Sequence, residues 1–111
     1  MKKRLKLEEH QIESIVEGLG LALATDKIMV DGEKVGFMHR EQPNDANDSG
    51  WRFFSGSESE DYLNQPKHLG HYDVNVIANY DRDIVPHLNA PVGSAFERAG
   101  DSFIETLAEL P

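Results

Sequence analysis

Two histidines in the second half of the chain are the residues best suited to hold a metal ion. His68 and His71 are three residues apart, which on a helix would place both rings on one face, and Asp73 follows. Pro66 and Gly70 argue against a helix here, and the spacing does not match the His-Glu-x-x-His pattern of a zinc-binding helix. We interpret both histidines as solvated loop residues and only weak metal candidates, so no cofactor is expected.

Three acids, Glu58, Glu60 and Asp61, could form a pair of catalytic carboxylates. General acid–base catalysis needs carboxyl groups whose pKa values are pushed apart by contrasting environments in a cleft. These acids stand in a run rich in serine and glycine, which indicates a solvent-exposed helix start. They suit better the rim of an interface with a basic protein, where charge mainly raises association rate and specificity.

No other motif predicts catalysis. None of the serines lies in a Gly-x-Ser-x-Gly elbow, and neither glycine-rich turn has the lysine or the spacing of a phosphate-binding loop. Residues 81–83, Asp-Arg-Asp, lack the remaining ligands of a calcium loop. We therefore predict no catalytic residue and no enzymatic activity.

The segment 72–81 is richer in tyrosine and asparagine than a plain surface needs. Tyrosine suits binding surfaces because it combines apolar area with a hydrogen-bonding tip, but it also covers the edge of a core. Both interpretations stay open. The candidate partner-binding residues are Glu58, Glu60, Asp61, Tyr80 and Asp81, whereas Trp51 is expected in the core.

The charge of the chain limits its partners. Its 111 residues carry 11 bases and 20 acids, a net charge of −9. Four of the bases lie in residues 1–7, so residues 8–111 carry seven bases, all twenty acids and a net charge of −13. Such a surface repels nucleic acid and attracts basic partners. We interpret residues 1–7 as a frayed, solubilising terminus.

Length and composition predict one soluble domain over residues 1–111. There is no cysteine, so disulfides and thiolate metal sites are excluded. No apolar run approaches the ~20 residues of a membrane span, so no membrane contact is expected. Glu8 and Glu9 stand where a signal peptide needs apolar residues, which predicts a cytoplasmic protein.

An aromatic strand at residues 51–54 is the expected centre of the core. Its side chains alternate, so Trp51 and Phe53 should lie on one face of a sheet, opposite Arg52 and Phe54. Because both faces are mostly apolar, the strand is expected to be internal. Aromatic rings supply most of the burial energy available to a small domain.

Two further elements are expected before this strand. The helical spacing of isoleucine, valine and leucine predicts an amphipathic helix over residues 8–17, ended by the glycines that follow. The dipeptide Asp31-Gly32 between two β-forming runs predicts a hairpin of residues 22–30 and 33–40. Gly36, within the second run, indicates close packing or a bulge.

The second half of the chain predicts shorter elements. Ser57 and Glu60 form a capping-box pattern for a short helix that ends before Pro66, and Asp73 is expected to cap a second helix over residues 74–79. Loops and turns are expected at 41–50, 68–72 and 81–91, and strands at 93–98 and 103–107 with a turn at 99–101 between them. These elements predict a single α+β domain with an antiparallel sheet of about four or five strands. The N-terminal helix should pack on one face, and the short helices should lie at an edge.

Four separated segments resemble a family of small bacterial domains. They are DKIMVDGEKVGFMHRE at 26–41, DSGWRFFSG at 48–56, IANYD at 77–81 and PVGSAFE at 91–97, so the resemblance covers about residues 22–97. The family was first catalogued as having unknown function. It was later grouped with the predicted immunity proteins of polymorphic toxin systems, as the immunity family numbered thirty-three. The resemblance implies an α+β fold and no known catalytic residue or cofactor, and it assigns a role to no residue.

Three functions follow as hypotheses. The first is a non-catalytic acidic binding domain that occludes a cognate basic toxin. The resemblance implies this role, which was inferred for the family from the genes that neighbour its members. The alternative is a regulatory or small-ligand-binding housekeeping domain, acting as a monomer or a homodimer. An enzyme or metal protein that uses His68 and His71 has the least support.

Overall fold

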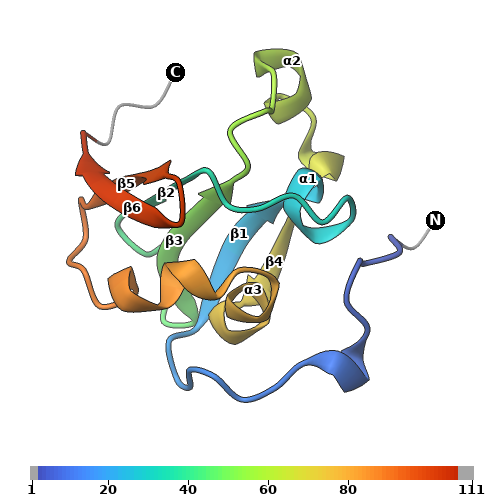
Figure 1. The fold of residues 1–111 in the computed structure, drawn as a ribbon, viewed down its shortest axis with the longest axis horizontal. Helices are drawn as coiled ribbons and strands as arrows, with labels where there is room; N and C mark the ends of the chain where they lie inside the picture. The colour runs from blue at the N-terminus through green and yellow to red at the C-terminus, as the bar shows by residue number, and fades with distance from the viewer. Residues whose placement is uncertain (1–2, 108–111) are drawn as a thin grey trace.

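A six-stranded sheet organises the chain (Figure 1). The structure is a computed structural model that describes residues 3–107. In spatial order β4-β1-β3-β2-β5-β6, β1 runs parallel to β3 and every other neighbouring pair is antiparallel. The strands are β1 (Leu21–Thr25), β2 (Phe37–Arg40), β3 (Asp48–Phe54), β4 (Leu69–Asp73), β5 (Ala95–Ala99) and β6 (Ser102–Thr106). The α+β class is confirmed, but the expected count of four or five strands is wrong, because β4 forms where a loop was predicted over residues 68–72.

Strand β3 lies inside the sheet, and its aromatic residues form the centre of the core. Trp51 and Phe53 are fully buried, and their rings lie 6.0 Å apart. The indole N–H of Trp51 donates a hydrogen bond to the carbonyl of Leu88, 3.1 Å away, so the one polar atom of the ring is satisfied. Arg52 and Phe54 occupy the opposite face, as the alternation predicts.

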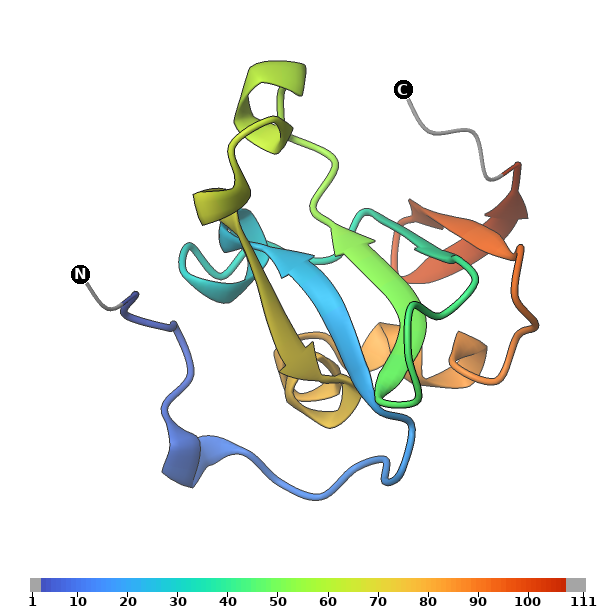
Figure 2. The ribbon, with the colours of Figure 1, turned by 180° about the vertical axis from the view of Figure 1, so that it is seen from behind.

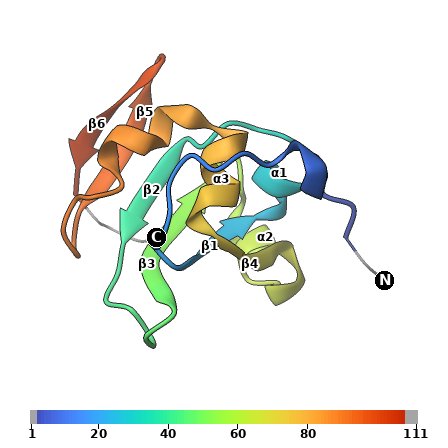
Figure 3. The same cartoon turned by 90° about the horizontal axis from the view of Figure 1, so that it is seen from below.

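One face of the sheet carries the main helical cover (Figures 1 and 3). Helix α3 (Val74–Tyr80) and the 3₁₀ helix η3 (Arg82–His87) lie across this face and bury Val74, Ile77 and Ile84. Asp73 caps α3 by accepting a hydrogen bond from the N–H of Asn75, so the second predicted helix and its cap are confirmed. The prediction that this helix lies at an edge of the sheet is wrong, because Ile77 of α3 packs in the core on the face of the sheet.

The remaining helices are single turns. They are the 3₁₀ helices η1 (Glu9–Gln11) and η2 (Pro66–His68), and the α-helical turns α1 (Asp26–Met29) and α2 (Glu60–Leu63). Helix α2 is capped by Ser59, which accepts from the N–H of Tyr62, and not by Ser57 as the capping-box pattern predicts. No helix within residues 3–107 combines the length and the apolarity that crossing a bilayer requires.

The predicted N-terminal helix over residues 8–17 is wrong, because only η1 forms there. Side chains of α3 take the backbone groups that a helix would pair internally. Asn75 accepts hydrogen bonds from the N–H groups of Ile15 and Val16, and Asn79 accepts from the N–H of Glu13. The chain is thereby held extended along α3, while its isoleucine and valine still pack against the core.

The predicted hairpin around Asp31-Gly32 is also wrong. Strand β1 pairs with β3 and β4 and never with β2, because α1 follows β1 directly. Gly32 has a φ of +79°, and its N–H donates to the carbonyl of Ile28, so this glycine ends α1. A tight hairpin and a helix C-terminus both favour a glycine with positive φ, so the dipeptide fits either.

The N-terminal basic segment contacts the domain over its described part. The ammonium of Lys3 lies 2.8 Å from Asp26 and 3.1 Å from the carbonyl of Leu69. The N–H of Lys6 donates to the carbonyl of Met29 at 2.8 Å. These contacts place residues 3–7 beside α1.

Gly36 connects two strands where a side chain would not fit, which confirms the close packing expected there. Its N–H donates to the carbonyl of Phe54, and its carbonyl accepts from the N–H of Arg98. A β-carbon at this position would lie 2.0 Å from the carbonyl oxygen of Ser55. The backbone would have to move to relieve such a contact.

We predict that Gly36→Ala lowers the free energy of unfolding by about 3 kcal/mol, because the added methyl group collides with backbone. The matched control is Gly93→Ala, where φ is +98° but no atom lies within 4 Å of the new β-carbon. The control should lose only about 1 kcal/mol of backbone strain. Urea denaturation measures both, and equal losses would show that the collision is relieved at no cost.

Candidate functional site

The face of the sheet opposite α3 and η3 is not covered by any described helix, and Figure 2 shows its strands unobstructed. We call it the open face. The strand register brings one row of side chains across it: Leu23 pairs with both His71 and Arg52, and His39 pairs with Arg52. Beside this row, the open face includes Leu21, Phe37, Phe54, Leu69, Glu97 and Ile104. Side chains from strands far apart in the sequence therefore meet on one surface.

Arg52 is a buried cation at the centre of the open face. Its side chain is 5% exposed, and its guanidinium donates two hydrogen bonds to Asp48, of 3.0 and 2.9 Å. A third bond of 3.1 Å goes to Glu41. The hydrogen bonds from Arg52 hold the pKa of Asp48 well below its usual range, and the same pair raises the pKa of Arg52. Both groups are therefore charged throughout the physiological range.

An aromatic cluster lies beside this ion pair. His39 stacks on Phe54, with ring centroids 5.8 Å apart and planes 2° from parallel, and Phe37 contacts both rings. Burial lowers the pKa of His39 below the ordinary 6.5, and the charge of Arg52 lowers it further although Glu41 opposes the shift. The imidazole is therefore neutral at neutral pH.

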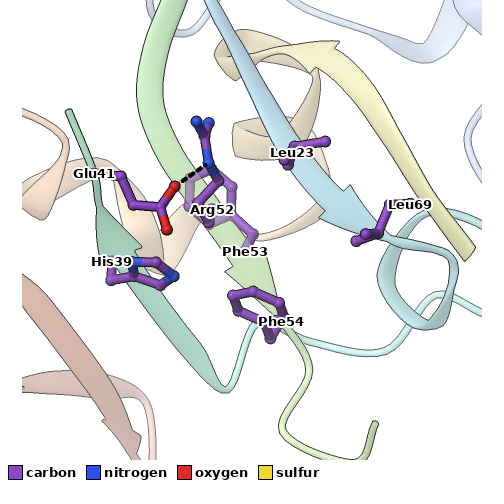
Figure 4. A pocket seen from close by; sticks show the side chains of 7 residues that line it. All are labelled: Leu23, His39, Glu41, Arg52, Phe53, Phe54 and Leu69. Atoms are coloured by element: carbon purple, nitrogen blue, oxygen red, sulfur yellow. Dashed lines mark hydrogen bonds and ion pairs between the residues drawn. The ribbon is translucent and has the colours of Figure 1, made fainter. Parts of the chain in front are cut away.

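A cavity of about 150 Å³ opens between the ion pair and the edge of the sheet (Figure 4). Leu23, Leu69 and Phe54 form its apolar wall, and Glu41 and Arg52 stand at its polar side. His39 also lines it and is 2% exposed, and neither of its ring nitrogens hydrogen-bonds to another residue of the range 3–107. The cavity thus offers apolar walls and one unused hydrogen-bonding group.

Acidic side chains surround this cavity. Glu41 borders it directly, and a neighbouring hollow of about 120 Å³ is lined by Asp45 and Asp48. Glu97 projects from β5 on the same face. Among the described strands, Arg52 is the only lysine or arginine on this face, and its charge is committed to Asp48 and Glu41. The surroundings of the cavity are therefore negative.

Three of the five residues suggested by sequence as partner contacts make internal bonds. Asp81 is buried and ion-paired with Arg98, and it accepts from the N–H of Val35 at 3.0 Å. The hydroxyl of Tyr80 accepts from the N–H of Leu7 and donates to the carbonyl of Met29.

Glu58 is held by a loop. It accepts hydrogen bonds from the hydroxyl of Thr25 and from the N–H groups of Ser55 and Gly56. Burial opposes its ionisation, but these bonds lower the pKa of Glu58 below its usual value. Glu60 is exposed with Asp61 on α2, which projects beyond one end of the sheet (Figures 1 and 2).

The structure separates the two histidines suggested as weak metal candidates. The ring of His68 stacks on Tyr62 at 3.8 Å, and its Nδ1 lies 2.8 Å from the carbonyl of the same residue. His71 is on β4 and faces the open side. Within residues 3–107, no three histidine or acidic side chains come together in a way that could hold a metal ion.

Sequence reasoning missed the residues of the cavity. Arg52 was the available signal, because a charged residue inside a central aromatic strand needs a buried partner. Its partners Asp48 and Glu41 lie in segments that read as a polar loop. The positions of Leu23 and Leu69 on this face could not be predicted, because Leu23 was assigned to a hairpin that does not form and Leu69 to a loop where strand β4 lies.

The fold and the open face define a small α+β domain that presents an apolar cavity surrounded by acidic side chains. Residues 22–107 match the family described as the Immunity protein Imm33 domain, so the chain belongs to the Imm33 immunity-protein family. This match extends the resemblance seen in the sequence to the end of β6. Comparison with curated proteins and with solved structures found no match.

We predict that Asp48→Asn lowers the free energy of unfolding by about 3 kcal/mol, because the guanidinium of Arg52 stays buried without its main counter-charge. Asp101→Asn, in the exposed turn before β6, is the control and should change stability by less than about 0.5 kcal/mol. Urea denaturation at pH 7 distinguishes them. Equal stability of the two variants would contradict the structural role of the Asp48–Arg52 pair.

The buried imidazole predicts a pH dependence. The folded chain binds a proton at His39 less readily than the unfolded chain does. The neutral imidazole therefore makes its full contribution to the free energy of unfolding above pH 6.5, and this contribution is lost as the pH falls below 6.5. His39→Gln should therefore lose less stability than the wild-type chain between pH 7.5 and pH 5.5. Val92→Gln, at an exposed position that does not titrate, should keep the wild-type slope. Equal slopes for all three would refute the burial effect.

Proposed function

We propose that the domain is a non-catalytic immunity protein that neutralises a cognate bacterial toxin by binding it in the cytoplasm and occluding its functional surface. The observation that carries this proposal is the match to the Imm33 immunity family over residues 22–107. Family membership implies a toxin as the partner. Occlusion by binding is the mechanism that needs no reaction from this chain.

The charge of the domain supports a basic partner. A net charge of −9 attracts a positively charged surface and raises the rate of encounter. Glu60 and Asp61 are the exposed members of the set suggested by sequence, and we propose that they contribute to this attraction from α2. Glu58, Tyr80 and Asp81 would act indirectly, by holding the loops and helices in place.

The alternative, a small-ligand-binding housekeeping domain, has one structural feature in its favour, which is the cavity beside Arg52. At about 150 Å³, however, the cavity is smaller than the roughly 300–1,000 Å³ of typical ligand pockets. It holds one side chain or ring more readily than a metabolite. The cavity therefore favours contact with a protein.

The immunity role leads us to expect a toxin encoded by a neighbouring gene, and the test is co-expression of this chain with that toxin domain. We expect the chain to restore growth and to form a stable 1:1 complex with the purified toxin, as measured by size-exclusion chromatography. Because the partner is attracted by charge, association should slow as salt concentration rises. Protection without complex formation would contradict binding as the mechanism, and a lack of protection would contradict the immunity role.

A further inference from the structure

The cavity on the open face has the size and lining of a pocket for one apolar side chain. An apolar cavity of about 150 Å³ in a protein interior holds a ring as large as benzene. Leu23, Leu69 and Phe54 supply the apolar walls here, and the cavity opens to the surface instead of being sealed. A leucine, methionine or phenylalanine from another molecule fits this space.

His39 points to an incoming group as well. The residue is 2% exposed and borders the cavity, and neither ring nitrogen has a hydrogen-bond partner within residues 3–107. These nitrogens are not among the buried atoms left without a partner, so they reach solvent at the cavity and are available for a new hydrogen bond. A backbone N–H that enters beside the anchoring side chain could donate to the neutral imidazole.

The charges around the cavity select what flanks that side chain. Glu41 bonds Arg52 through one oxygen only, and its side chain is 42% exposed. Asp45 and Glu97 are exposed on the same face, where the strands offer no free cation. An approaching acidic segment would be repelled, whereas lysine or arginine on either side of the anchor would be attracted.

We propose that the open face is the toxin-docking surface, and that its cavity takes one apolar side chain from a toxin segment flanked by lysine or arginine. This inference rests on the proposed immunity function and adds the site of contact and the chemistry of the partner. The toxin's anchor would lie between Leu23 and Leu69, with Leu21 at the edge of the contact.

Charged substitutions test the surface, with the toxin domain expected from a neighbouring gene as the probe. Leu21 and Val92 are both exposed aliphatic residues, at 38% and 47%, but Val92 lies in the loop before β5. We expect Leu21→Glu and Leu69→Glu to weaken binding at least tenfold by calorimetry, and Val92→Glu to change it less than twofold. Thermal melts of each free variant show whether it is folded.

A charge reversal on β5 and β6 tests the acidic surroundings. Glu97 faces the open side, whereas Glu105 is exposed on the opposite face of the neighbouring strand. Glu97→Lys should slow association several-fold at low salt, and Glu105→Lys should leave the rate within twofold of the wild type. Equal rates for the two reversals would overturn the charge part of the proposal.

Single cysteines give a readout that does not depend on a disruptive substitution, because the chain contains no cysteine. Leu21→Cys and Val92→Cys should both react with a maleimide in the free chain. Saturating toxin should slow the reaction of Leu21→Cys at least tenfold and leave that of Val92→Cys unchanged. Equal rates for Leu21→Cys with and without bound toxin would overturn the docking surface.

The outcomes separate this inference from the immunity proposal. If the wild-type chain neither binds nor neutralises the toxin, the immunity role fails and the docking surface fails with it. If the wild-type chain binds and protects, but Leu21→Glu and Leu69→Glu bind as tightly, only the docking surface is overturned. Tight binding by those variants together with weak binding after loss of Glu60 and Asp61 would place the contact on α2.

Discussion

The buried pair of Arg52 with Asp48 is the interaction on which the open face depends. Because the main helical cover lies on the other side of the sheet, this side must satisfy its central residues without a second layer. Two carboxylates, from the start of β3 and from the residue after β2, neutralise the guanidinium within the sheet. The hydrogen-bonded guanidinium closes one side of the cavity between Leu23 and Leu69, and the stacked rings of His39 and Phe54 form the adjoining wall. The shape of the cavity therefore depends on how the sheet buries the guanidinium of Arg52.

Acidic residues serve two purposes in this small domain. Asp81 and Glu58 accept backbone N–H groups and fasten loops whose donors would otherwise be left unpaired. Part of the acidic surplus is thus structural and cannot meet a partner. Exposed acids beside the cavity and on α2 remain free to meet a partner, as do others elsewhere on the surface, such as Asp101 and Glu105.

The sequence predicted elements whose signals are local. The alternation around Trp51, the Asp73 cap of α3 and the turn between β5 and β6 depend on neighbouring residues, and all three are confirmed. The errors come from contacts between distant segments. Asn75 and Asn79 draw residues 13–16 out of a helix, and β4 becomes a strand because it pairs with β1. The open face could not be predicted, since its residues come from several strands whose order the sequence does not specify.

The structure of the chain bound to its cognate toxin, which the immunity role places in a neighbouring gene, tests the central claim most directly. The account predicts that one apolar toxin side chain fills the cavity between Leu23 and Leu69, with lysine or arginine of the toxin near Glu41 and Asp45. A complex in which the toxin contacts α2 or the face covered by α3, and the cavity stays open to solvent, would contradict it.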